Sequence, residues 1–206
     1  MWRKTWATLS HLRCFNNGGT GFIVSANDKS WLVTCVHIVT GVLNTTLDAK
    51  NFNGASLSVL GTDIIIPLSK DGKKTFNVIP NPRVKNGLID IMAVSLSYDQ
   101  RSLLCNYESY DIESIVDIEE GQEVHIEGYA GINMFSKPVV STISGNIIKS
   151  NRARFVINTP SIKGLSGGAV CSEQGLVGIL YGNEGSDESP EAGVCLKLQV
   201  VKFIFS

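Results

Sequence analysis

The sequence predicts an all-β protein, because its composition and the pattern of its apolar runs both favour strands and turns. Val, Ile, Thr, Gly and Ser are abundant in the 206-residue chain, whereas runs of the helix-favouring residues Ala, Leu, Glu and Lys are scarce. Short apolar runs alternate with turn signals along the whole chain. A polar stretch without a clear period, residues 105–121, is a candidate linker. Together these features predict a barrel or a sandwich on each side of the linker.

The predicted strands follow one another at short intervals. The run 21–39 is expected to form two strands around the turn Ala26-Asn27-Asp28-Lys29. Further strands are predicted at residues 56–61, 63–69, 76–80 and 88–97 before the linker, and at 123–130, 139–150, 153–160, 167–172, 175–182 and 192–205 after it. The basic segment 1–17 is interpreted as a first strand, although a basic stretch with no acid before Asp28 is also typical of a mitochondrial targeting segment.

Charge and hydropathy exclude two classes of partner. The net charge is −1, so we expect no binding to nucleic acid and no attraction to an acidic membrane surface. No apolar stretch approaches the roughly 20 residues that a membrane-spanning helix needs, so no membrane span is predicted.

The cysteines indicate a reducing environment. Their number is odd and their spacing does not repeat, so we expect reduced core residues and neither a disulfide framework nor a metal site. The expected compartment is intracellular, either the cytoplasm or the mitochondrion. The residues concerned are Cys14, Cys35, Cys105, Cys171 and Cys195.

The segment Gly164-Leu165-Ser166-Gly167-Gly168 places one hydroxyl among three glycines, directly before an apolar run. Either these residues form a plain tight turn, or another group must approach the backbone closely at the serine. A serine hydroxyl becomes a nucleophile only beside a base, which needs a partner that orients it and stabilises its charged form. Attack on a carbonyl also requires donors for the oxyanion that forms.

His37 and Asp90 are the candidate partners of Ser166. His37 ends the apolar run WLVTCV, whereas His11 and His125 have the pattern of structural residues. Apolar neighbours surround Asp90 on both sides, and a buried carboxylate must be hydrogen-bonded or paired. The alternatives remain that His37 is a structural residue at a strand end, that Asp90 caps a turn, or that Asp63 is the acid.

Four blocks resemble the chymotrypsin-fold serine proteases, and most closely the HtrA/Deg branch of trypsin-like peptidases. They are residues 19–25 (GTGFIVS), 33–37 (VTCVH), 90–94 (DIMAV) and 164–168 (GLSGG). Weaker similarities between these blocks extend the resemblance over nearly the whole chain. In chain order the candidate residues are His37, Asp90 and Ser166, which is the order of one of the known convergent triads.

The resemblance implies two six-stranded antiparallel barrels packed side by side, with residues 1–110 carrying His37 and Asp90, and residues 117–206 carrying Ser166. It implies an endopeptidase that acts on polypeptides without a metal or organic cofactor. The backbone N–H groups of Gly164 and Ser166 would form the oxyanion hole, so the loop must carry no side chain where the substrate approaches.

The resemblance also places the substrate pocket. Its floor has no acid to pair with Lys or Arg, and Asn183 stands where chymotrypsin-like pockets have a small glycine, so we expect cleavage after small or medium apolar residues. The acidic loop 184–188 could attract basic groups at neighbouring subsites. The implied pocket residues are Pro160, Ser161, Ile162, Leu180, Tyr181, Gly182 and Asn183.

The chain departs from the family at several points. Leu165 stands where secreted trypsin-like enzymes carry an aspartate, and there is no IVGG-like start, so activation by N-terminal cleavage is not expected. The cysteines do not match the conserved bridges of the secreted enzymes, and no PDZ domain is expected. The oligomeric state stays open. Two other functions also remain open: a catalytically silent peptide-binding module, and a viral-type protease that processes a polyprotein.

Overall fold

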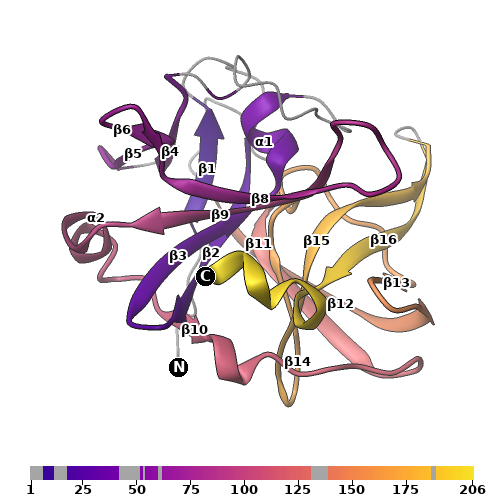
Figure 1. The fold of residues 1–206 in the computed structure, drawn as a ribbon. Helices are drawn as coiled ribbons and strands as arrows, with labels where there is room; N and C mark the ends of the chain where they lie inside the picture. Colours follow the sequence, from indigo (N-terminus) through magenta and orange to yellow (C-terminus); the bar gives the residue numbers. More distant parts are fainter. Residues whose placement is uncertain are drawn as a thin grey trace.

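A computed structural model of the chain describes residues 7–11, 18–41, 52, 54–59, 62–130, 139–186 and 189–206. Strands dominate these residues, so the predicted all-β class is confirmed. Two β-units lie side by side, and the chain passes from the first to the second after β10 (Figure 1). Among the described residues, no helix has the length and apolar character needed to cross a bilayer.

The N-terminal unit is an eight-stranded sheet with the order β5-β4-β1-β2-β3-β9-β8, and β10 pairs with β2 outside this path. All pairs along the path are antiparallel, whereas β10 is parallel to β2. β6 (Ser69–Lys70) and β7 (Lys73–Lys74) form a separate small hairpin. The strands of the sheet are β1 (Ala7–His11), β2 (Gly18–Ala26), β3 (Lys29–Thr34), β4 (Ser56–Val59), β5 (Ile65–Pro67), β8 (Phe76–Pro80), β9 (Leu88–Leu96) and β10 (Ser109–Asp111).

The C-terminal unit is a closed six-stranded barrel with the order β11-β12-β13-β16-β15-β14. Each of its strands was predicted from the sequence, and its strand number is the one that the family resemblance implies. The strands are β11 (Glu123–Ala130), β12 (Val139–Ser150), β13 (Arg154–Ile157), β14 (Ala169–Ser172), β15 (Gly175–Gly185) and β16 (Pro190–Lys197).

The predicted hairpin turn between β2 and β3 is confirmed. Ala26 pairs with Lys29, and the two residues between them have positive φ angles, 49° for Asn27 and 60° for Asp28. Such angles at both central positions define the type I′ turn, whose twist matches that of the flanking strands. Asn and Asp tolerate this conformation better than other residues with a side chain.

Helices lie where the sequence predicted strands or indicated no regular element. β3 ends at Thr34, and His37 lies in the short helix α1 (Val36–Thr40) instead of at a strand end. A capping box of Ser97 and Gln100 begins α2 (Tyr98–Leu103).

The last part of the run predicted as a strand, residues 192–205, is a 3₁₀ helix, η3 (Leu198–Phe205). Its residues Leu198, Val201 and Ile204 are buried at intervals of three, the period of this helix. The polar residues Gln199 and Lys202 interrupt this run three positions apart, a spacing that fits the 3₁₀ helix and that the prediction of a strand did not take into account.

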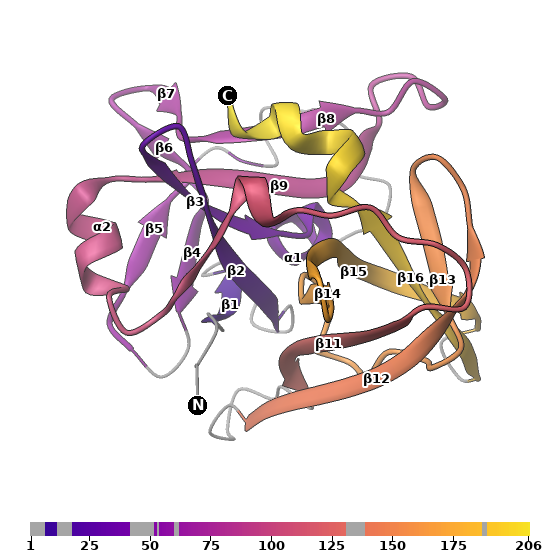
Figure 2. The ribbon, with the colours of Figure 1, turned by 90° about the horizontal axis from the view of Figure 1, so that it is seen from below.

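The segment predicted as a linker also contributes to both units. β10 extends the N-terminal sheet, η2 (Ile112–Ser114) follows it, and Ile115 then bridges to Leu176 of the C-terminal barrel. Figure 2 shows this segment running from the N-terminal sheet towards β11. The polar composition of residues 105–121 did not indicate these pairings, because a short edge strand needs few apolar residues.

The two units share a hydrophobic core where they meet. The cluster under the N-terminal sheet also includes Cys171 and Leu176 of the barrel. η3 packs against β8, β9 and β15, so the end of the chain contacts both units (Figure 2). Phe205 of η3 packs edge-on against Trp31 at 6.4 Å between ring centroids. This continuous core fixes the relative placement of the loops that the two units contribute to the site.

Candidate active site

His37 and Asp90, far apart in the sequence, form a close pair. The distance between His37 Nδ1 and Asp90 Oδ2 is 2.6 Å, and the His37 backbone N–H donates to Asp90 Oδ1 at 2.9 Å. The side chains are 21% and 17% exposed, so each is mostly buried yet reaches solvent. Because a carboxylate only accepts hydrogen bonds, the tautomer of the neutral imidazole that fits this contact carries its proton on Nδ1 and has Nε2 as an acceptor.

Local structure holds this pair in place. The neighbours of His37 in α1, namely Val36, Ile38 and Val39, are buried, and Gly41 ends the helix in the left-handed conformation at φ 76°. Asp90 lies in β9, where the next residues along the strand are buried, as its apolar neighbours in the sequence predicted. Its carboxylate binds His37 at two points, so the alternative that Asp90 serves only as a turn cap is wrong.

The loop around Ser166 depends on its glycines. Gly164 and Gly167 have φ angles of 99° and 85°, a region that side chains disfavour. A Cβ on Gly167 would lie 2.0 Å from the carbonyl oxygen of Thr20. The Gly167 N–H donates to the carbonyl of Leu180 at 2.8 Å, so the backbone turns directly into the barrel. Close approach of other backbone, rather than a free surface turn, explains Gly167.

The Ser166 loop and α1 both lie close to Gly19. The Thr20 N–H donates to the Ser166 carbonyl at 2.7 Å. A Cβ on Gly19 would lie 2.1 Å from Ile38 Cδ1 and 3.0 Å from the Ser166 carbonyl oxygen. The three candidate residues are thus brought to one region from both units. Within the described part of the chain, no hydrogen bond joins the Ser166 hydroxyl to His37.

Comparison with known proteins identifies the family. A model of the trypsin-like peptidase domain matches residues 19–179. The chain belongs to the trypsin-like peptidase family. The resemblance of the four sequence blocks to trypsin-like serine proteases is therefore confirmed, and the peptidase is a hydrolase of the serine protease class.

Solved structures of serine proteases share the fold. The active form of the Rv3671c protease from M. tuberculosis matches with a TM-score of 0.59 and 16% identity, over 98% of this chain and 80% of that one. The serine protease domain of the Sesbania mosaic virus polyprotein matches with a TM-score of 0.60 and 14% identity, over 97% and 92%. The MamO protease domain from Magnetospirillum magneticum gives 0.56 and 16%, over 96% and 94%. No curated protein sequence matches the peptidase significantly.

Cys35 lies close to the His37–Asp90 pair. The ligand atoms of these three residues lie within 4.8 Å of one another, a spacing that could hold a metal ion. However, the Cys35 thiol is fully buried and donates to the Leu180 carbonyl at 3.4 Å. Burial, and to a lesser degree the charge of Asp90, raises the pKa of Cys35, which keeps the thiol neutral. Because Asp90 already engages His37 Nδ1, this donor set fits a histidine–carboxylate pair better than a metal centre.

The segments predicted to line the substrate pocket are joined by Asn183. Its Oδ1 accepts the Ser161 N–H at 2.7 Å, and its Nδ2 donates to the Ser161 carbonyl at 3.3 Å. Tyr181 is partly buried, and its hydroxyl accepts a hydrogen bond from Arg154 at 3.3 Å. Leu180 is fully buried in the barrel core, so it contributes to this region through its backbone.

The remaining predicted positions around the serine differ in exposure. Ile162 is 48% exposed, whereas Pro160 and Gly182 are half-buried. Leu165 is fully buried in the barrel core. In the acidic loop, residues 187 and 188 lie outside the described residues.

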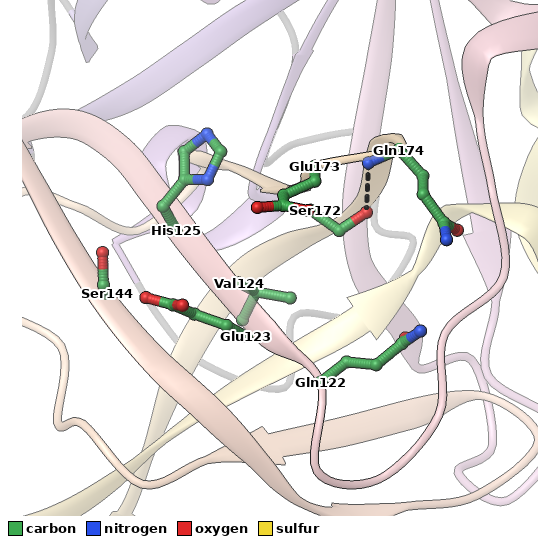
Figure 3. A pocket seen from close by; sticks show the side chains of 8 residues that line it. All are labelled: Gln122, Glu123, Val124, His125, Ser144, Ser172, Glu173 and Gln174. Atoms are coloured by element: carbon green, nitrogen blue, oxygen red, sulfur yellow. Dashed lines mark hydrogen bonds between the residues drawn. The ribbon is translucent and has the colours of Figure 1, made fainter.

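A separate polar cavity of about 440 Å³ lies on the barrel. Its lining comes from β11, β12 and the turn after β14, and none of His37, Asp90 and Ser166 belongs to it (Figure 3). His125, whose ring nitrogen Nε2 lies 3.6 Å from Glu127 Oε1, is one of its lining residues. The interpretation of His125 as a residue outside the catalytic group agrees with this placement.

Proposed function

We propose that the peptidase is a serine endopeptidase in which Ser166 is the nucleophile, His37 the general base and acid, and Asp90 the group that orients the imidazole. The observation that carries this proposal is the two-point contact of Asp90 with His37, which leaves Nε2 as the proton acceptor.

In the proposed mechanism, Nε2 of His37 takes the Ser166 proton as Oγ attacks the scissile carbonyl carbon. The protonated imidazole, stabilised by Asp90, then gives this proton to the leaving amine, and an acyl-enzyme forms. A water molecule then attacks the carbonyl carbon of the acyl-enzyme, with His37 again as base. This releases the carboxylic acid product and restores the Ser166 hydroxyl. The N–H groups of Gly164 and Ser166 would stabilise the oxyanion of each tetrahedral intermediate.

Cleavage of an unfolded protein tests the proposal. Purified peptidase is incubated with reduced, unfolded casein, and new peptides are identified by mass spectrometry, with Ser166→Ala as the matched control. We expect internal cleavage by the wild type and none by the variant. The missing hydrogen bond between Ser166 and His37 favours one competitor, a catalytically silent peptide-binding module. Saturable peptide binding by both proteins without any cleavage would support that competitor.

We propose that the peptidase cleaves after small or medium apolar residues such as Val, Ala, Ile or Leu. The two hydrogen bonds between Asn183 and Ser161 join the proposed floor and wall of the pocket, which would limit its width. No acid stands among Pro160, Ser161 and Ile162, so a buried Lys or Arg side chain would lack a counter-charge there.

A peptide library tests this preference in the wild type and in Asn183→Gly. We expect the wild type to prefer apolar residues, and the glycine variant to gain about 10-fold or more in kcat/KM for Phe relative to Ala, because pocket volume discriminates by about this factor. Arg152→Gly, at an exposed turn of the barrel, is the control and should leave the ratio unchanged. A dominant preference for Lys or Arg in the wild type would overturn the assignment.

We further propose that the peptidase works in a reducing, intracellular compartment, because Cys35, Cys105 and Cys195 are free thiols. Mass spectrometry of the native protein is expected to find all five cysteines reduced, with activity that persists in a reductant. Iodoacetamide should modify exposed Cys105, while buried Cys35, Cys171 and Cys195 react only after unfolding. A native disulfide bond would refute both the redox state and the compartment.

A further inference from the structure

Thr20 connects the Ser166 loop to the rest of the molecule. This residue of β2 is fully buried. Its hydroxyl donates to the Gly164 carbonyl at 2.8 Å, and its backbone N–H donates to the Ser166 carbonyl at 2.7 Å. The same hydroxyl accepts the N–H of Tyr129 in β11 at 2.9 Å. One side chain therefore joins β2, the loop and the barrel.

The surroundings are shaped to admit this threonine. A Cβ on Gly128 would lie 2.7 Å from Thr20 Oγ1, and a Cβ on Gly167 would lie 2.0 Å from the Thr20 carbonyl oxygen. The hydroxyl of buried Thr34 donates to that same carbonyl at 2.8 Å. Both the side chain and the backbone of Thr20 are thus held closely, so its hydroxyl is fixed in direction.

The fixed Thr20 hydroxyl limits the conformations that the Gly164–Ser166 loop can adopt. Gly164, at φ 99°, has more conformational freedom than any other residue type, and its backbone alone does not hold one conformation. Because the peptide group is planar, anchoring the carbonyls of Gly164 and Ser166 fixes the Gly164–Leu165 and Ser166–Gly167 peptide planes, and so restrains ψ at both residues. These are the two residues whose N–H groups would receive the oxyanion.

We propose that the Thr20 hydroxyl is a positioning group that holds the Gly164–Ser166 loop in the conformation able to bind an oxyanion. The inference rests on the proposed function and adds a residue to it. Thr20 acts through Gly164 and touches neither substrate nor the reacting atoms. Its loss should lower kcat and leave KM nearly unchanged, because the oxyanion exists only in the transition state and the intermediates.

The test compares Thr20→Val, which removes the hydroxyl at constant shape, with Thr20→Ser, which retains it, and Thr20→Cys, which offers a weaker donor. Thr75→Val is the matched control, since Thr75 also donates its hydroxyl to a backbone carbonyl, that of Pro67 at 2.8 Å, in the N-terminal unit. For each variant we measure kcat, KM, the inhibition constant of a peptide aldehyde that forms a tetrahedral adduct, and amide hydrogen exchange at Gly167 and Gly168.

We expect kcat of Thr20→Val to fall about 10- to 100-fold, and its affinity for the aldehyde to fall in parallel. Thr20→Ser should stay within about threefold of the wild type, with Thr20→Cys between the two. Exchange at Gly167 and Gly168 should accelerate in Thr20→Val and not in Thr75→Val. If Thr20→Val does not fold, the test rests on the kcat values of the other two variants: Thr20→Ser should be close to the wild type and Thr20→Cys should be lower.

Two results would overturn the inference. One is an unchanged kcat and aldehyde affinity per folded Thr20→Val molecule, and the other is a serine variant as impaired as the valine variant. Failure of the proposed function is distinguishable, because a wild type that neither cleaves peptides nor binds the aldehyde would still show whether amide exchange in the loop depends on the Thr20 hydroxyl.

Discussion

Replacing Ser166 with Ala is expected to lower kcat on the order of 10⁴- to 10⁶-fold while the protein folds as the wild type does. The loop is held by the Ser166 carbonyl, which alanine retains, and by the N–H of Gly167. Only the hydroxyl is lost, and with it the nucleophile. The change is measured as kcat on a cleaved peptide, with the thermal midpoint of unfolding as the check on folding.

His37→Ala should cost about as much as Ser166→Ala, and the double variant should lose little more, because members of a catalytic unit act together. His125→Ala is the matched control, since this histidine lies outside the group and should leave kcat within about twofold. Losses that multiply in the double variant would mean that His37 is not the base for Ser166.

Asp90→Asn is expected to lower kcat about 10³- to 10⁴-fold. Asp90 Oδ1 accepts the His37 backbone N–H, so an amide oxygen would keep that place and turn the NH₂ group towards Nδ1. Nδ1 would then have to accept, which moves the imidazole proton to Nε2. A protonated Nε2 cannot take the proton of Ser166.

The control is Asp63→Asn, because Asp63 was the other acid that the sequence offered and the structure leaves it exposed. Kinetics of both variants decide between the two acids. Two results would remove Asp90 from the mechanism. One is an equal loss of kcat in Asp90→Asn and Asp63→Asn, and the other is a loss of folding stability in Asp90→Asn without a change in kcat per folded molecule.

Asp90 illustrates what could be predicted from the sequence. A carboxylate between apolar neighbours needs a partner, so its burial and pairing followed from local pattern alone. The strand pattern likewise predicted the strands of the C-terminal unit, and the family resemblance implied that they form a six-stranded barrel. The turn at Asn27 and Asp28 was predicted for the same kind of reason, because few residues tolerate positive φ.

Other features depend on contacts that no local pattern reveals. The helix around His37 comes from an apolar run that fits a strand equally well, and η3 differs from a strand only in the spacing of Gln199 and Lys202. β10 pairs with β2 although its own residues are mostly polar. The hydrogen bond from Thr20 to Gly164 joins residues 144 positions apart, so only the folded chain shows that this threonine reaches the loop.

Labelling with a biotinylated fluorophosphonate tests the central claim most directly, because this reagent reacts with a serine only when a base activates it. The native wild type, Ser166→Ala, Asp90→Asn and heat-unfolded wild type are treated in parallel, and the modified residue is located by peptide mass mapping. We predict one adduct, on Ser166, in the native wild type, a far slower reaction in Asp90→Asn, and none in the other two samples. A folded wild type that is not labelled, or an adduct on a different serine, would contradict the assignment of Ser166, His37 and Asp90 as a catalytic unit.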